Sequence, residues 1–151
     1  MKIKDRVALC TLIGILSALA GKSSAYLIKI FYPSMITETD TIGRVFFTVH
    51  QLYTVPAYIF STFLSLTIGP IFTFGYILLL DLTGWRLLWL KGYLVASTGY
   101  VLTGLLIKGL HLLPQEELSA WIPIFLYLAH LVLGTVMIVL TKLWGLPKKT
   151  N

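Results

Sequence analysis

Four long apolar stretches, separated by short polar segments, account for most of the 151-residue chain. They cover residues 7–31, 57–80, 87–110 and 119–143, and each is long enough to cross the hydrocarbon core of a membrane as a helix. Hydrophobic residues make up 57% of the sequence, and charged residues make up 12%, about half the share of a soluble domain. The pattern predicts an all-α integral membrane protein, a four-helix bundle that forms a single transmembrane domain over residues 1–151.

The first apolar stretch has a second interpretation, a cleaved signal peptide over residues 1–25. The chain begins with the basic residues Lys2, Lys4 and Arg6, and Ser23-Ser24-Ala25 resembles a cleavage site. Apolar residues resume at once after it, in AYLIKIFY. We therefore favour a retained span.

The region between the first and second spans is harder to divide. Residues 33–41 are polar, but residues 43–82 are too long for one span and contain no polar turn. Pro56 is the natural break, because proline disfavours helix at the residue before it. We expect residues 41–54 to form a short interfacial helix whose face with Phe46, Phe47 and Leu52 contacts lipid or the bundle. Pro70 should kink the second span.

Basic residues between the spans predict the orientation. One side carries eight of them: Lys2, Lys4, Arg6, Arg86, Lys91, Lys142, Lys148 and Lys149. The other side carries Lys29, Arg44 and Lys108, together with acidic residues. The pattern predicts a multi-pass protein of the plasma membrane with both termini cytoplasmic. It also accounts for the net charge of +6 without nucleic-acid binding, which needs a clustered basic face.

Polar residues in all four spans fall at one depth. Lys22 lies about 13 Å from the far end of the first span, and His130 reaches a similar depth in the fourth. The same layer contains Ser24, Ser65, Thr67, Ser97, Thr98 and Tyr100. A charge there costs about 3 kcal/mol or more unless it is paired or hydrated, and no span offers a carboxylate at this depth.

This layer has two interpretations. It is either a polar cavity, for a proton relay, a small substrate or a lipid headgroup, or a set of interhelical hydrogen bonds. We expect Lys22 and His130 to point into the bundle, with His130 neutral because two cations would repel each other. A Lys22→Met substitution should then leave the fold intact or stabilise it. Lys29 and Lys108 should extend toward the membrane surface.

The sequence predicts no cofactor, metal or catalytic residue. A bis-histidine haem site needs two histidines at one depth, but His130 is deep whereas His50 and His111 are near the surface. No pair of metal ligands has helical spacing, and phosphate-loop, GxSxG and HExxH motifs are absent. Whether the protein is an enzyme stays open, with the balance against it.

Short motifs suggest a family. The KDR opening, Lys22 after small residues, and AHLVLG with His130 and Gly134 resemble small four-span bacterial membrane proteins of unknown function, the YqhR-like proteins. This family would have an acidic residue where Tyr26 stands and an aromatic residue where Leu133 stands. The resemblance implies a bacterial plasma membrane and no assigned chemistry.

Two functions agree with these features. The first is a non-enzymatic bundle that acts through contacts with membrane lipids, a partner membrane protein or further copies of itself. The alternative is a small transporter or channel subunit that conducts through the layer around Lys22 and His130.

Overall fold

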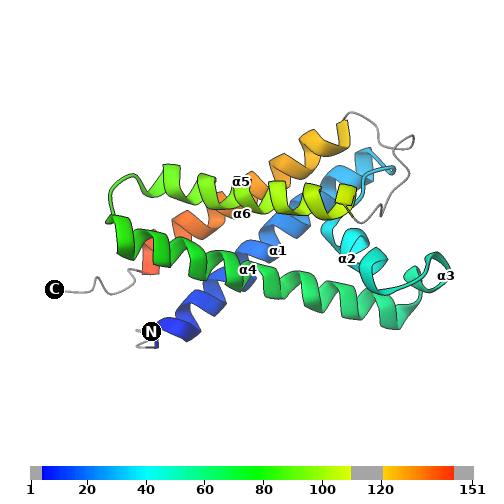
Figure 1. The fold of residues 1–151 in the computed structure, drawn as a ribbon, viewed down its shortest axis with the longest axis horizontal. Coiled ribbons are helices and arrows are strands. Elements are labelled where there is room, and N and C mark those ends of the chain that lie inside the picture. The colour runs from blue at the N-terminus through cyan, green and yellow to red at the C-terminus, as the bar shows by residue number, and fades with distance from the viewer. Residues whose placement is uncertain (1–4, 110–120, 145–151) are drawn as a thin grey trace.

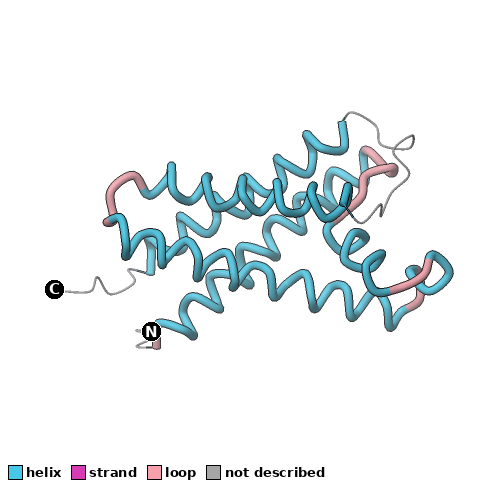
Figure 2. Tube along the Cα trace, in the orientation of Figure 1, coloured by secondary structure: helices cyan, strands magenta, loops and turns pink. Residues whose placement is uncertain are grey.

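The computed structural model describes residues 5–109 and 121–144, and the regular structure in these ranges is entirely helical (Figure 2). The helices are α1 (Arg6–Phe31), α2 (Glu38–Phe46), α3 (Val49–Leu52), α4 (Val55–Thr83), α5 (Leu88–Gly109) and α6 (Trp121–Trp144). The helices α1, α4, α5 and α6 are long and apolar enough to cross a membrane. They begin and end within three residues of the expected spans, whose residues 110, 119 and 120 lie outside the described ranges. The expected all-α fold with four long apolar helices is confirmed.

The four long helices pack as antiparallel neighbours. α1 contacts both α4 and α6, and α5 contacts the same two helices. The start of α1, the turn between α4 and α5, and the end of α6 lie together at the left of Figure 1. The helices α2 and α3 lie at the opposite end, which we call the α2 end. The core therefore runs along the bundle, with α2 and α3 added at one end.

The contact between α1 and α4 depends on glycines. A Cβ atom added to Gly69 would lie 2.1 Å from the Gly14 carbonyl oxygen and 2.8 Å from the Ala18 Cβ. A Cβ on Gly14 would lie 2.3 Å from the nitrogen of Pro70, which lies within the continuous helix α4. The backbones of α1 and α4 are in contact here, and helices can approach this closely only where the residues between them are small.

Polar groups close the other end of the bundle. The Asp5 side chain caps α1 by accepting hydrogen bonds from its first turn. Arg6 of α1 forms an ion pair with Asp81 of α4. Lys91 Nζ, on α5, donates to the Gly84 carbonyl at 2.6 Å, which satisfies a backbone group that the end of α4 leaves free. These contacts fix the ends of three helices relative to one another.

The expectation of one continuous helix over residues 41–54 was wrong, although Phe46 and Phe47 do contact the bundle, at Phe60 of α4. The segment forms two helices, and the first of them, α2, begins earlier and packs into the bundle against α4. After Phe31 the chain turns back, so that Met35, Thr39, Thr41 and Gly43 are buried. Small side chains allow this: a Cβ on Gly43 would lie 2.5 Å from Leu52 and 3.1 Å from the Ser61 hydroxyl. The chain leaves helical geometry again at residues 53–54, just before Pro56, which lies in the first turn of α4.

Candidate functional site

The polar groups at the α2 end gather around the start of α2, residues 37–40, which we call the acidic turn. Thr37 and Asp40 form a capping box: the Asp40 backbone N–H donates to the Thr37 hydroxyl, and the Thr37 backbone N–H donates to Asp40 Oδ2 at 2.9 Å. This reciprocal arrangement satisfies the free N–H groups of a helix start. It also fixes the directions in which the carboxylates of Glu38 and Asp40 point.

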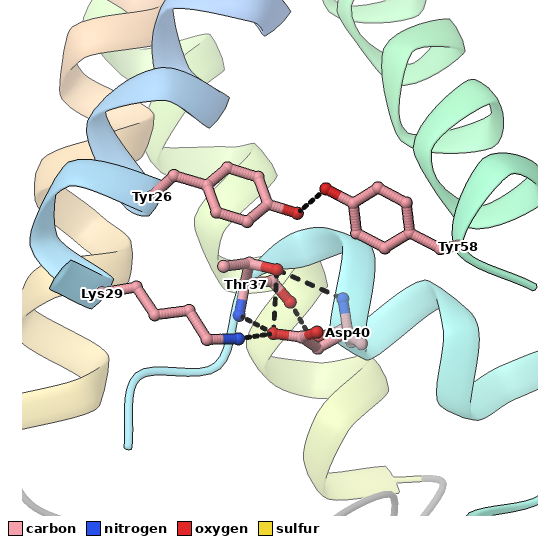
Figure 3. Close-up of polar contacts among 6 residues, drawn as sticks. Tyr26, Lys29, Thr37, Asp40 and Tyr58 are labelled. Atoms are coloured by element: carbon pink, nitrogen blue, oxygen red, sulfur yellow. Dashed lines mark hydrogen bonds and ion pairs between the residues drawn. The ribbon is translucent and has the colours of Figure 1, made fainter. Parts of the chain in front are cut away.

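Asp40 faces α1. Lys29 Nζ donates to Asp40 Oδ2 at 2.8 Å, as Figure 3 shows, and the Thr37 hydroxyl donates to the same oxygen at 2.9 Å. Burial raises the pKa of Asp40, but the hydrogen bonds from Lys29 and Thr37 outweigh it and hold this pKa below its ordinary value of 3.8. Lys29, in the last turn of α1, thus has a specific partner in Asp40.

Two tyrosines bridge α1 and α4 beside this ion pair. The hydroxyls of Tyr26 and Tyr58 share a hydrogen bond of 2.9 Å, and the two rings point toward each other in Figure 3. The ion pair joins α1 to α2 and the tyrosine pair joins α1 to α4, and the two pairs lie close together in Figure 3. Together they form one polar wall of a pocket.

This pocket has a volume of about 370 Å³, within the range of small-molecule binding sites. It is lined by Tyr26, Lys29, Thr39, Asp40, Leu52, Tyr53, Thr54, Val55, Tyr58 and Ser61. Tyr53 and Val55 are 81% and 71% exposed, so they form its rim. Among the described residues, the lining combines one cation, one anion, hydroxyl groups and apolar side chains, a composition that suits an amphipathic ligand. We call it the α2 pocket.

The other face of the acidic turn meets α6. Glu38 Oε1 lies 3.0 Å from His130 Nε2, and the His130 side chain is only 2% exposed. The approach is outside the geometry of a well-formed hydrogen bond, so this is an ion-pair contact. His130 Nδ1 lies 2.8 Å from the Leu126 carbonyl oxygen, which can only accept, so Nδ1 carries a hydrogen.

Lys22 and His130 line one small cavity of about 20 Å³, together with Glu38 and Thr37. This volume suffices for about one water molecule. Lys22 Nζ donates to the Ser65 hydroxyl at 2.6 Å, and Glu38 lines the same cavity as Lys22. The lysine therefore shares its cavity with a carboxylate that comes from outside the four long helices. The interpretation of two cations without an acidic neighbour was wrong.

Four residues of the expected polar layer lie apart from this cavity: Ser24, Thr67, Ser97 and Thr98. The hydroxyls of Ser24, Thr67 and Thr98 donate to carbonyls of their own helices, those of Gly21, Leu64 and Leu94. Ser97 shares a hydrogen bond of 3.4 Å with Tyr127 of α6. The Tyr100 ring packs edge-on against His130, with centroids 5.9 Å apart. The structure thus brings together Lys22, Ser65, His130 and Tyr100 and leaves the other four in separate contacts.

Sequence reasoning missed Glu38 and Asp40 because it placed residues 33–41 outside the bundle. One signal was present, however. The run TETD, residues 37–40, has Thr at the cap position and an acidic residue three positions later, which is the signature of a helix start. Read in this way, the sequence predicts a helix from residue 38. It gives no sign that this helix packs inward.

Comparisons with known proteins add no relative: no family model, curated protein or solved structure matches the chain. Within residues 5–109 and 121–144, no group of three or more His, Cys, Asp or Glu side chains is arranged to hold a metal ion. The candidate site is therefore defined by its geometry alone.

Proposed function

We propose that this chain is a non-enzymatic integral membrane protein that acts by binding a lipid in the α2 pocket. The observation that carries the proposal is the lining of this pocket, where an ion pair and tyrosine hydroxyls lie beside apolar side chains. A lipid has the same two parts, a polar headgroup and apolar chains. The Lys29–Asp40 pair and the hydroxyls suit the headgroup, whereas Leu52 and Val55 suit the beginning of the chains.

The surface of the long helices supports the membrane location. Large apolar side chains are exposed along all four, including Leu19 on α1, Phe63 on α4 and Leu105 on α5. Such side chains on the outside of a bundle are stable in lipid and costly in water. We place the protein in the plasma membrane with both termini cytoplasmic. The α2 pocket then lies at the outer leaflet, near the headgroups of the lipids there.

The small cavity favours this function over conduction. Its volume of about 20 Å³ offers room for one water molecule, Lys22 donates to Ser65 on α4, and His130 forms an ion-pair contact with Glu38. Hydrogen bonds of this kind commonly hold helices together in membrane bundles. We therefore assign Lys22 and His130 to holding the acidic turn in place, so that the α2 pocket keeps its shape.

A rim substitution tests the proposal. Val55→Trp should fill the mouth of the pocket, whereas Ile59→Trp is a matched control, because Ile59 is also exposed near the start of α4 and does not line the pocket. The purified protein in detergent is titrated with a phospholipid, and binding is followed by the rise in melting temperature. We expect saturable binding that Val55→Trp weakens at least about tenfold and that Ile59→Trp leaves unchanged. Binding that is unsaturable, or equal in the two variants, would refute the proposed function.

A further inference from the structure

We propose that the α2 pocket is specific for the headgroup of a zwitterionic phospholipid, with its phosphate at Lys29 and its ammonium group at Asp40. This inference rests on the proposed function and adds the class of lipid. It is carried by three features of the lining: the balance of charge, the hydrogen-bonding capacity left over, and the aromatic rings around the ion pair.

The described part of the lining carries one charge of each sign. Among the described residues that line the pocket, Lys29 is the one cation and Asp40 the one anion, and their side chains are 34% and 26% exposed. An anionic headgroup such as phosphoglycerol would bring its charge close to Asp40, and a cationic amphiphile would bring its charge close to Lys29. A zwitterion offers an opposite charge to each of them. Complementarity of this kind gives selectivity more than affinity.

The ion pair retains capacity for a ligand. Lys29 Nζ has three hydrogens, and the structure gives it one bond, to Asp40. The hydrogen bonds to Asp40 from Lys29 and Thr37 all end on Oδ2, so that Oδ1 remains able to accept. A phosphate oxygen and an ammonium group can therefore be bound without breaking the pair or the cap of α2.

The tyrosines complete the site. In the hydrogen bond between Tyr26 and Tyr58, one hydroxyl hydrogen is shared and the other is left to donate, which suits a phosphate oxygen. Tyr53 contributes a third ring at the rim. Cations of the ammonium type bind over aromatic faces within about 6 Å of the ring centre. A headgroup with its phosphate inside and its ammonium near the rings satisfies both kinds of contact.

The experiment compares phospholipids that differ only in the headgroup. The purified chain, in a neutral detergent, is titrated with phosphatidylcholine, phosphatidylethanolamine and phosphatidylglycerol with the same short acyl chains. We expect the two zwitterionic lipids to bind about tenfold more tightly than phosphatidylglycerol. Each titration is repeated with Val55→Trp, which should weaken every saturable interaction with the pocket.

Charge variants then test the assignment of each end of the headgroup. Asp40→Asn removes the negative charge but keeps a side-chain oxygen that can accept the hydrogen bond from the Thr37 backbone N–H. Phosphatidylglycerol should then bind this variant as tightly as phosphatidylcholine does, or more tightly. Lys29→Met should weaken all three phospholipids about tenfold, and Lys29→Arg should keep the selectivity. Lys108→Met is the matched control, because Lys108 is an exposed lysine at the end of α5 that does not line the pocket.

The outcomes separate the inference from the function on which it rests. If the native protein binds phosphatidylglycerol as tightly as the zwitterionic lipids, and Val55→Trp still weakens binding, the headgroup assignment is overturned and lipid binding stands. If no lipid shows saturable binding that Val55→Trp weakens, both the headgroup assignment and the proposed lipid binding are refuted. Unchanged selectivity in a folded Asp40→Asn variant, with a melting temperature near that of the native protein, also overturns the headgroup assignment.

Discussion

At the scale of single residues, Lys22 shows how a charged group is accommodated in an apolar helix. It donates to Ser65, and the Ser65 hydroxyl donates in turn to the Thr62 carbonyl at 2.8 Å. The carboxylate of Glu38 lines the same cavity, which reduces the cost of the charge. Each partner comes from a different helix from that of Lys22, and this is why inspection of α1 alone shows an isolated lysine.

We predict that Lys22→Met lowers the free energy of unfolding by only about 1 kcal/mol, the usual contribution of one hydrogen bond. The loss is small because Ser65 keeps its bond to the Thr62 carbonyl, so no polar atom on α4 is left without a partner. Thermal unfolding in detergent measures this, with Lys22→Arg as the control that keeps the charge. A loss of about 4 kcal/mol would show that Lys22 is a main structural charge of the bundle.

We predict that the stability of the protein depends on pH through the Asp40 carboxylate. Its pKa in the folded protein is below the ordinary value of 3.8, because hydrogen bonds from Lys29 and Thr37 favour the carboxylate. The stabilisation is therefore fully present above about pH 5 and is lost as the pH falls through the folded pKa, below about pH 4. The melting temperature should drop more steeply in this acid range in the native protein than in Asp40→Asn. Identical acid profiles would contradict the role given to this carboxylate.

At the scale of elements, the four long helices and the short helix α2 differ in how far the sequence determines them. Each long helix corresponds to a predominantly apolar stretch of at least 20 residues, so local composition is sufficient to predict it. The residues of α2 are mixed, and their position depends on contacts with His130, Lys29 and Ser61 from other helices. Such tertiary contacts leave no periodic signal in the sequence. The two carboxylates of the site were missed for this reason.

The contact of α1 with α4 gives a prediction for two glycines of α4. Gly69→Ala should destabilise the protein by about 1–3 kcal/mol, because the new Cβ would lie 2.1 Å from the Gly14 carbonyl oxygen and the helices would have to separate. Gly75→Ala is the matched control, since a Cβ there has no neighbouring atom within 4 Å. It should be neutral or stabilise α4 by up to about 1 kcal/mol. Equal effects of the two substitutions in thermal unfolding would contradict the close contact.

At the scale of the whole molecule, we predict how the bundle is oriented across the membrane. Arg6, Arg86, Lys91 and Lys142 lie at or near helix ends at the end of the bundle opposite the α2 end, which favours a cytoplasmic location for that end. Single cysteines at Arg86 and at His50, in a Cys10→Ser background, report the orientation in intact cells. An impermeant thiol reagent should label the cysteine at position 50 and not the one at position 86. The reverse labelling pattern would show that the predicted orientation is wrong and that the α2 pocket lies at the cytoplasmic leaflet.

The central claim is that the α2 pocket holds a lipid, and the most direct measurement is the mass of the protein extracted gently from its own membrane. Native mass spectrometry should show about one zwitterionic phospholipid retained on each chain, because the pocket of about 370 Å³ has room for one headgroup. Val55→Trp should lose this lipid and Ile59→Trp should keep it. Bare protein, or an equal amount of retained lipid in both variants, would contradict the claim.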